Sequence, residues 1–367
     1  MMNQSHTPQL RPRRIWQRAA LCAAALAAAL GSCHAAAGVT KDPLDIPALM
    51  TRLTTTTQLS GIARAGKRLV AVGVRGLIIS SDDEGASWTQ RRAPVSSDLL
   101  AVQFPTPAKG WIVGHDGVVL HTRDSGASWT KQLDGRQAAT QLTAHFTRLA
   151  QGGDANAARL LGEIKLNYES GPEQALLDLW FEDELRGFVC GSFGTLLATT
   201  DGGKSWQSYV EHVEYASLLH LNAIRGGAGS VFIASEKGIV FKLDRARGRF
   251  VPIETGYKGS FFSLATAGDT IVAAGLRGTA YRSTDGGTSW EPRDTGLIAS
   301  ITGAAADDGG ALLMVSQNGS VLLGDRAGAR FRSNRVPRPG VLSGVAKSGA
   351  NRAVVVGYGG VQVVPLK

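Results

Sequence analysis

The chain has 367 residues, 46 of them glycine, and a formal net charge of +9. This length allows a large buried core, and the three cysteines exclude a disulfide-based scaffold. Removing the four arginines near the N-terminus lowers the charge to +5, which does not indicate a nucleic-acid-binding protein.

Residues 1–37 have the features of a cleaved signal peptide. Four arginines precede an apolar run, residues 19–30, which is too short to span a bilayer comfortably. Small residues at 35–37 form a cleavage site, so we expect an exported, periplasmic protein that begins near Gly38. A lipoprotein signal ending before Cys33 stays open as an alternative, with a lipid anchor on Cys33 and attachment to a membrane.

Cys190 would be the last cysteine left after cleavage at residue 37, because Cys22 and Cys33 lie in the signal. No disulfide could then form within the mature chain. Cys190 lies in a strand-like stretch, so we expect a buried small side chain rather than a nucleophile.

An eight-residue phrase, Ser/Thr-x-Asp-x-Gly-x-Ser-Trp, occurs four times in the chain. Its copies end at Trp88, Trp129, Trp206 and Trp290, which are 41, 77 and 84 residues apart. The two longer spacings are about two repeats of ~41 residues, or one repeat plus an insertion. A period in the forties with one aromatic residue per unit is typical of a β-propeller.

A Gly-x-x-Gly pair precedes each phrase, and its second glycine lies 12 residues before the tryptophan. Phe250 and Phe331 stand at the same offset in two further units, and a seventh pair, Gly357/Gly360, starts a unit that the chain end cuts short. Each unit has four short β-rich runs bounded by turn residues. The sequence therefore predicts an all-β fold, a seven-bladed propeller of four-stranded blades over residues 47–367.

The phrase is an Asp-box, or BNR repeat, and we expect its role to be structural. The Asp closes a tight turn between the third and fourth strands by accepting backbone N–H groups, and the Trp packs as an apolar block. A glycan or Ca²⁺ site at each Asp is the alternative, which the position of these turns on the outer rim disfavours. The structural pairs are Asp83/Trp88, Asp124/Trp129, Asp201/Trp206 and Asp285/Trp290.

The spacing between the second and third units is too long by about 36 residues, at 138–173. Leu142, Phe146 and Leu149 follow a helical spacing, and Asp154 could cap a second helix. We therefore predict a helical insertion between the second and third blades. It could bind a partner or cover one end of the central channel.

Counting strand reversals places the insertion and the Gly-x-x-Gly turns on one face and the Asp-box turns on the other. Three units carry a cation just before the second glycine: Arg75, Lys237 and Arg277. Such a face is predicted to bind an acidic partner, although charged residues are also ordinary in exposed turns.

The last unit lacks its outer strand, which would leave an exposed sheet edge. Residues 49–57 precede the first unit and are rich in β-branched side chains. We predict that they supply the missing strand and so close the ring.

The whole unit, Val-Gly-x-x-Gly followed by the Asp-box with Arg before the second Gly, resembles the photosystem II stability/assembly factor family. The pattern is clearest at residues 72–88 and 274–290, and the resemblance covers roughly residues 50–367. It implies an exported, non-enzymatic scaffold or assembly factor that binds a membrane or envelope protein client. A cluster of arginines on one face is implicated in that family, and Arg75 and Arg277 match it here.

We expect a monomer with no cofactor, no metal and no nucleic acid. The client need not belong to photosynthesis, because relatives of this kind also occur in non-photosynthetic bacteria. These expectations follow from the resemblance together with the lack of a metal-binding motif or a phosphate loop in the sequence.

The alternative class is an Asp-box glycoside hydrolase, sialidase-like or endoglucanase-like. The sialidase opening Phe/Tyr-Arg-Ile-Pro is missing, and the nearest string, residues 331–334, falls in an outer-strand position. A two-carboxylate glycosidase needs its acids ~5–10 Å apart in a cleft. The spacing pairs none of the candidates Asp116, Glu182, Asp183, Glu184 and Glu236.

Overall fold

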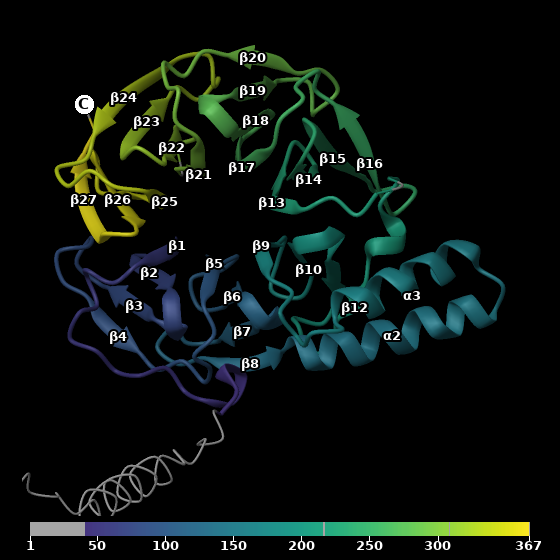
Figure 1. Ribbon diagram of the computed structural model, residues 1–367. Helices are drawn as coiled ribbons and strands as arrows, with labels where there is room; N and C mark the ends of the chain where they lie inside the picture. The colour runs from purple at the N-terminus through teal and green to yellow at the C-terminus, as the bar shows by residue number, and fades with distance from the viewer. Residues whose placement is uncertain (1–40, 216, 308, 367) are drawn as a thin grey trace, which may run out of the picture. The chain divides into compact units, whose positions relative to one another are not determined.

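The computed structural model describes residues 41–215, 217–307 and 309–366. Seven antiparallel sheets, consecutive in the sequence, surround a central axis as the blades of a propeller (Figure 1). The predicted fold class, a seven-bladed propeller with a helical insertion after the second blade, is confirmed. The propeller belongs to a compact unit, residues 43–367, and the predicted signal at 1–37 with Cys33 lies outside the described residues.

The strands alternate in direction within each blade, and the innermost strand of each blade comes first in the chain. The first three blades are β1 (Leu59–Ala65), β2 (Arg68–Gly73), β3 (Ile78–Ser81), β4 (Thr89–Arg91); β5 (Leu99–Gln103), β6 (Gly110–Gly114), β7 (Val119–Thr122), β8 (Thr130–Leu133); and β9 (Leu176–Phe181), β10 (Gly187–Gly191), β11 (Leu196–Thr199), β12 (Gln207–Ser208). The next two are β13 (Leu221–Gly227), β14 (Ser230–Ser235), β15 (Ile239–Asp244), β16 (Arg249–Glu254); and β17 (Phe261–Ala267), β18 (Thr270–Gly275), β19 (Ala280–Ser283), β20 (Glu291–Arg293). The last two are β21 (Ile301–Ala306), β22 (Leu312–Ser316), β23 (Ser320–Gly324), β24 (Phe331–Arg335); and β25 (Leu342–Ser348), β26 (Arg352–Gly357), β27 (Gly360–Pro365).

The second strand of each blade reads as a continuous apolar run because it is covered on both sides by neighbouring blades. Every residue of β14 and of β18 is buried, for example. The inner strands instead contain half-buried as well as buried residues, since one side faces the channel. Apolar clusters span each pair of neighbouring blades, so burial of apolar surface is what holds the ring together.

Side chains of the inner strands also hydrogen-bond to the backbone of the next blade. The Gln103 amide accepts from Phe181 N at 2.6 Å and donates to Phe181 O at 3.2 Å, which joins blades 2 and 3. Asn222 donates to Phe261 O between blades 4 and 5, and Thr302 to Leu342 O between blades 6 and 7. These bonds fix the inner strands against each other.

The prediction that residues 49–57 complete the last blade is wrong. That blade is a three-stranded sheet, and within the described chain the segment gives it one backbone hydrogen bond, from Val361 N to Thr55 O at 3.0 Å. The hydroxyl of Thr57 instead donates to Leu53 O at 2.6 Å, and Leu53 N donates to the hydroxyl of Thr51. Such local bonds compete with a β ladder, so a threonine-rich segment forms turns here despite its β propensity.

The ring closes through the first Asp-box turn, whose Glu84 forms hydrogen bonds with the last blade. Glu84 accepts from Ser348 Oγ and Gly349 N at 3.0 Å each. Arg64 pairs with Glu84 at 3.2 Å and donates to Lys347 O at 2.7 Å, and the Arg64 hydrogen bond is the main cause that lowers the pKa of Glu84. Closure therefore depends on packing and on these side chains rather than on an added strand.

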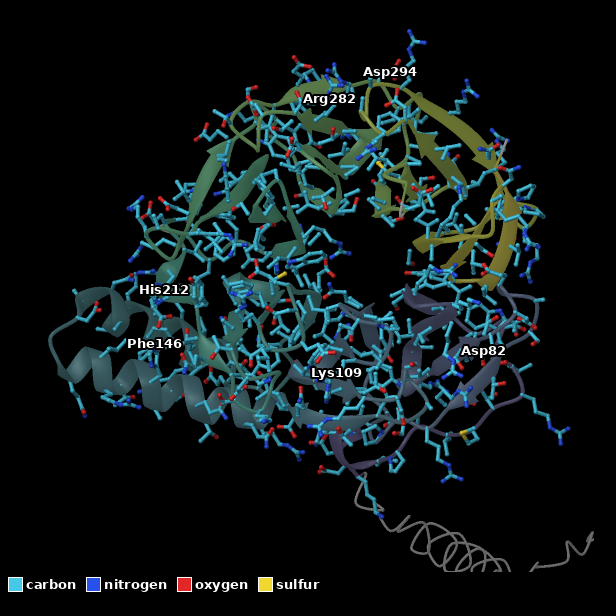
Figure 2. All side chains as sticks on the ribbon, turned by 180° about the vertical axis from the view of Figure 1, so that it is seen from behind. Asp82, Lys109, Phe146, His212, Arg282 and Asp294 are labelled. Atoms are coloured by element: carbon cyan, nitrogen blue, oxygen red, sulfur yellow. The ribbon has the colours of Figure 1, made fainter. Side chains whose placement is uncertain are left out.

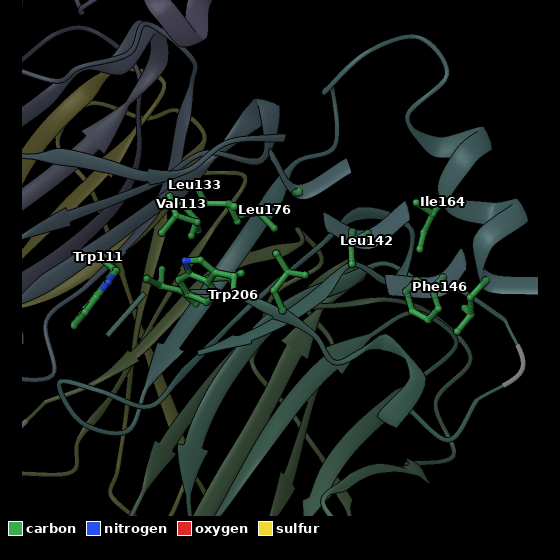
Figure 3. Close-up of a cluster of buried hydrophobic side chains, with 14 of the residues drawn as sticks. Trp111, Val113, Leu133, Leu142, Phe146, Ile164, Leu176 and Trp206 are labelled. Carbon is green, nitrogen blue, oxygen red and sulfur yellow. The ribbon is translucent and has the colours of Figure 1, made fainter. Parts of the chain in front are cut away.

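The insertion is a hairpin of two helices, α2 (Gly135–Gln151) and α3 (Ala155–Asn167). Asp134 caps the first helix with a capping box and Asp154 caps the second. Leu142 and Phe146 from α2 and Ile164 from α3 point toward one another (Figure 3) and belong to the same buried cluster as Trp206 of blade 3.

The hairpin lies outside the ring, beside β12 of blade 3 (Figure 1). His145 of α2 contacts the loop after β12, where its Nε2 lies 2.7 Å from Glu211 Oε1. None of the residues that line the channel comes from the hairpin, so the alternative of a lid over the channel is wrong. Cys190 is fully buried, as predicted, and burial raises the pKa of its thiol.

Candidate partner-binding face

The two faces of the propeller are built from different turns. The turn face carries the Gly-x-x-Gly turns between the second and third strands and the connections from each blade to the next. The Asp-box face carries the Asp-box turns and the turns between the first and second strands. The hairpin base is on the turn face, where Gly117 N donates to Gln174 O at the end of the insertion.

Both glycines of a Gly-x-x-Gly turn are required by close backbone contacts. A Cβ on Gly73 would lie 2.2 Å from Gln58 O, and one on Gly76 would lie 2.2 Å from Val95 O. Gly76 also has a positive φ of 71°, which favours glycine. The turn is therefore held tightly against the connections on either side.

The residue before the second glycine is fixed through its backbone and exposes its side chain. Arg75 N donates to Asp98 Oδ1 at 2.7 Å, and Arg277 N donates to Ser300 Oγ at 3.4 Å. Phe193 N donates to His220 Nδ1 at 3.3 Å. All three acceptors directly precede an inner strand, a regularity that sequence reasoning missed but that a polar residue at this position could have signalled.

Five of the turns between the second and third strands hold a non-glycine residue in the left-handed backbone region. The φ angles are 54° at Arg75, 59° at Asp116, 51° at Phe193, 57° at Lys237 and 57° at Arg277. A left-handed conformation of this kind costs on the order of 1–3 kcal/mol when the residue is not glycine.

The three cations at this position differ from Asp116 and Phe193, whose side chains contact a neighbouring residue. Asp116 accepts from Ser97 Oγ at 2.6 Å, and the Phe193 ring lies against His220 with centroids 4.9 Å apart. Arg75, Lys237 and Arg277 are exposed, and within the described ranges no ion pair or side-chain hydrogen bond engages them. Lys237 and Arg277 are on adjacent blades, whereas Arg75 is on blade 1, so they share a face without forming one cluster.

Sequence reasoning also missed the apolar side chains on the turn face. Phe193, Leu276 and Tyr358 in the turns and Ile298 in a connection are exposed, Ile298 to 92%. Large apolar side chains interspersed with free cations are typical of surfaces that bind proteins.

The Asp-box carboxylates are occupied within their own turns. Asp83 accepts from Ser87 N at 2.9 Å, from Ser87 Oγ at 2.5 Å and from Ser81 Oγ at 2.7 Å. The hydrogen bond from the Ser87 hydroxyl is the main cause that lowers the pKa of Asp83 to about 2. Asp124, Asp201 and Asp285 accept the same bonds from the serine four residues later. Each carboxylate therefore stabilises its own turn.

The candidate hydrolase carboxylates do not converge. Glu182, Asp183 and Glu184 lie on the Asp-box face and pair with Arg245, Arg186 and Lys109. Asp116 and Glu236 lie on the turn face in blades 2 and 4. The string at 331–334 is on β24, the outermost strand of blade 6. In the part of the chain that the structure describes, no group of three or more His, Cys, Asp or Glu side chains could hold a metal ion.

The central channel has a volume of about 1080 Å³ and is lined by the inner strands. It contains an ion pair in which Arg225 lies 2.5 Å from the buried Asp178. Burial raises the pKa of Asp178 despite this partner. Asp178 also accepts from Ile224 N at 2.9 Å, so it joins blades 3 and 4 and has a structural role.

The sequence matches the family model described as photosynthesis system II assembly factor YCF48 over residues 52–142 and 156–335. The chain belongs to this family. The gap in the match falls within the helical hairpin, and the match ends before the last blade.

A curated relative, the photosystem II assembly lipoprotein Ycf48 of Trichormus variabilis, is 26% identical over 159 residues. That alignment spans 40% of this chain and 44% of the relative, less than half the relative's length. Among solved structures, the fold is similar to YCF48 bound to D1 peptide, with TM-score 0.61, 17% identity and coverage of 88% of this chain and 99% of the other. YCF48 from Cyanidioschyzon merolae gives TM-score 0.57 and 16% identity, with 88% and 98% covered.

None of the helices among the described residues has the length and apolar character needed to cross a membrane.

Proposed function

We propose that this protein is an exported, non-enzymatic assembly factor that binds an acidic segment of a membrane-protein client on its turn face. Membership of the assembly-factor family supports the role. The similar structure of YCF48 holds a D1 peptide, which supports a membrane-protein segment as the kind of ligand. The relative named as a lipoprotein supports export and attachment to a membrane, and Cys33 is the residue we propose for the anchor. We also propose that the propeller acts as a monomer.

The observation that carries the proposal is the combination of strain and exposure at Arg75, Lys237 and Arg277. Each is in a backbone conformation that glycine would adopt at lower cost. Each keeps a long cationic side chain that contributes no ion pair to the fold within the described ranges. Residues held in unfavourable conformations are common at binding sites, so a role outside the fold accounts for both properties.

The chemistry of the face limits the client. Free arginine and lysine side chains attract carboxylates and speed association with an acidic partner. The exposed apolar residues nearby, Phe193, Leu276 and Ile298, can cover apolar side chains of the same segment. An acidic peptide that also carries large apolar residues therefore fits better than a glycoside substrate, because the candidate catalytic carboxylates lie on two faces and Glu182, Asp183 and Glu184 are paired with cations.

The test is client capture by a variant in which Arg75, Lys237 and Arg277 are all replaced by Glu. We expect crosslinking pull-downs from cell envelopes to lose the client that the wild type captures, because the substitution reverses three charges on the face. Thermal unfolding should change little, since these side chains support no other part of the fold.

The matched control replaces Lys67, Arg123 and Lys204 by Glu. These residues are exposed cations on the Asp-box face, so the control makes the same change in net charge on the opposite side. The proposal fails if both variants capture the client equally well.

A further inference from the structure

We propose that the outer edge of blade 6 is a second binding surface, where an extended acidic protein segment adds to β24 as a fifth strand. This surface is on the rim rather than on the turn face, and it does not depend on the proposed function.

The outer strand of a propeller blade is a sheet edge, and most edges in this protein are short or covered. The segment after β12 covers β16, through a bridge from Val213 to Phe250 and a bond from Glu214 N to Phe250 O at 2.9 Å. Arg338 and Gln362 bond to each other along β27. The strands β4, β12 and β20 have three, two and three residues, and β20 contains Pro292.

The edge of β24 has none of these protections. It has five residues and no proline. Among the described residues, no backbone hydrogen bond reaches it from any segment other than its partner β23. An edge of this length with free backbone groups is a template for pairing with another strand.

The hydrogen-bonding pattern identifies the free groups. Asp325 N donates to Arg330 O at 3.2 Å, and Val336 N donates to Gly319 O at 3.3 Å, so residues 330 and 336 bond inward. Since hydrogen-bonded and non-hydrogen-bonded pairs alternate along an antiparallel ladder, the N–H and C=O groups of Phe331, Ser333 and Arg335 point away from β23. An added strand would find three residues ready to bond.

Charge on this edge selects the partner. Residues 326–366 contain no Asp or Glu. Four exposed arginines lie on β24 or in the turn before it, and we call them the arginine strip: Arg326, Arg330, Arg332 and Arg335. Within the described chain none of the four pairs with a carboxylate. Figure 2 shows nitrogen-tipped side chains projecting outward along this part of the rim.

Rim arginines on blades 4 and 5, by contrast, are neutralised. Arg247 and Arg249 share Glu214, and Arg282 and Arg293 share Glu291 on β20 of the neighbouring blade. Charged residues on an edge strand can serve only to prevent aggregation, but four unpaired arginines repel one another at a cost that carboxylates of a partner would relieve. Their planar donors pair with carboxylates in two parallel bonds. Arg330 and Arg332 are two residues apart and so lie on the same face of the strand, which makes a strand with Asp or Glu at alternate positions complementary to them in both backbone and charge.

The test measures binding of a fluorescein-labelled ten-residue peptide, in which Glu alternates with Thr and Val, to the full-length protein by fluorescence anisotropy. A second peptide has the same sequence with alternate backbone nitrogens methylated, so it keeps every charge and cannot form a ladder. We expect the first to bind and the second to bind at least tenfold more weakly. Equal binding of the two peptides would overturn the proposal, because the strip would then act through charge alone.

Two variants locate the site. Ser333→Pro removes an outward N–H without breaking the ladder to β23 and should weaken peptide binding at least tenfold, as should Arg330→Glu with Arg332→Glu. The control, Arg123→Glu with Lys204→Glu on the Asp-box face, should change it less than twofold. Should Ser333→Pro fail to fold, the methylated peptide still decides the question on the wild type.

Two further results would overturn the proposal. One is that the peptide does not bind, whereas anionic phosphatidylglycerol vesicles do bind and the two arginine substitutions abolish that binding. This result would assign the strip to a membrane. The other is loss of peptide binding in the Arg75, Lys237 and Arg277 variant, which would move the peptide to the turn face. Retained binding in that variant would separate this surface from the proposed function.

Discussion

The Asp-box face and the turn face are made by the same repeats, yet their side chains behave in opposite ways. On the Asp-box face, each Asp, Ser and Thr of the phrase bonds within its own turn, as at Asp124. On the turn face, the backbone of the repeat is fixed, and within the described ranges the three cations before the second glycine have free side chains, as at Arg277. One face is therefore constrained by folding, and the other can vary in sequence without loss of the fold.

Two units lack the Asp-box phrase, and they show which of its features the blade requires. Phe250 and Phe331 replace the tryptophan, and Phe250 is fully buried. An Asp is still present in each turn: Asp244 accepts from Ala246 N at 3.0 Å, and Asp325 accepts from Ala329 N at 2.8 Å. The turn keeps an aromatic residue and a capping carboxylate even where the phrase has been lost, so these two features are what the blade requires.

The largest effect we expect is on stability, from Trp129→Ala. The indole is 94% buried, packs edge-on against Phe104 and donates to Gly126 O at 3.2 Å. Removing it leaves a cavity, so the free energy of unfolding should fall by about 3–5 kcal/mol, measured by urea denaturation.

The matched change on the turn face is Phe193→Ala, where the aromatic side chain is 47% exposed. It should cost at most about 1 kcal/mol, because a half-exposed side chain contributes less buried apolar surface. Similar losses from both substitutions would mean that the two faces contribute equally to folding, and the contrast between them would not hold.

A smaller effect on stability is expected from acid. The pKa of Asp83 and that of Asp201 are lowered to about 2, mainly by the hydrogen bonds from Ser87 and Ser205. Because these folded-state values lie below the ordinary value of 3.8, the carboxylates stabilise the protein fully above pH about 4. That stabilisation is lost as the pH falls toward 2.

Thermal unfolding of the wild type and of Asp201→Asn, followed from pH 7 to pH 2, tests this. The variant should lose less of its melting temperature than the wild type between pH 4 and pH 2. Burial also lowers the pKa of His121 from 6.5 to about 4, so its contribution is lost between pH 6.5 and 4 and should be equal in the two proteins. Parallel curves below pH 4 would show that the Asp-box bonds do not persist in solution.

The fold could be predicted from the sequence because its determinants are local and repeated. The tryptophan phrase and the glycine pair recur at fixed offsets, and each encodes one turn whatever the neighbouring blades contain. The ring closure could not be predicted in the same way. It depends on Glu84 meeting Ser348 and Gly349, more than 260 residues away in the chain, and on threonines that bond to their own backbone.

The candidate sites were predictable to different degrees. The position of Arg75, Lys237 and Arg277 on one face follows from strand count alone, but their positive φ angles and lack of ion pairs do not. The arginine strip was not predicted at all, although residues 326–366 lack acidic residues. Seeing it required knowledge of which rim arginines have carboxylate partners, and those partners come from other turns and other blades.

The smallest stability effect, and the one that bears most directly on the turn face, is expected from Arg277→Gly. Glycine adopts a φ of 57° without strain, which favours the variant by about 1–2 kcal/mol, while the greater freedom of glycine in the unfolded chain costs about 0.5–1 kcal/mol. The variant should be more stable than the wild type by roughly 0.5–1 kcal/mol in urea denaturation.

The same variant should capture less client, since it removes one of the three free cations. A gain in stability with a loss of binding would mean that arginine is kept at this turn for its side chain, against the preference of the backbone. As a control, Arg332→Gly on β24 places glycine in an extended strand, where it should destabilise by about 0.5–1 kcal/mol. If Arg277→Gly destabilises as much as that control does, the left-handed turn carries no strain, and the exposed cations lose the energetic argument for a role in binding.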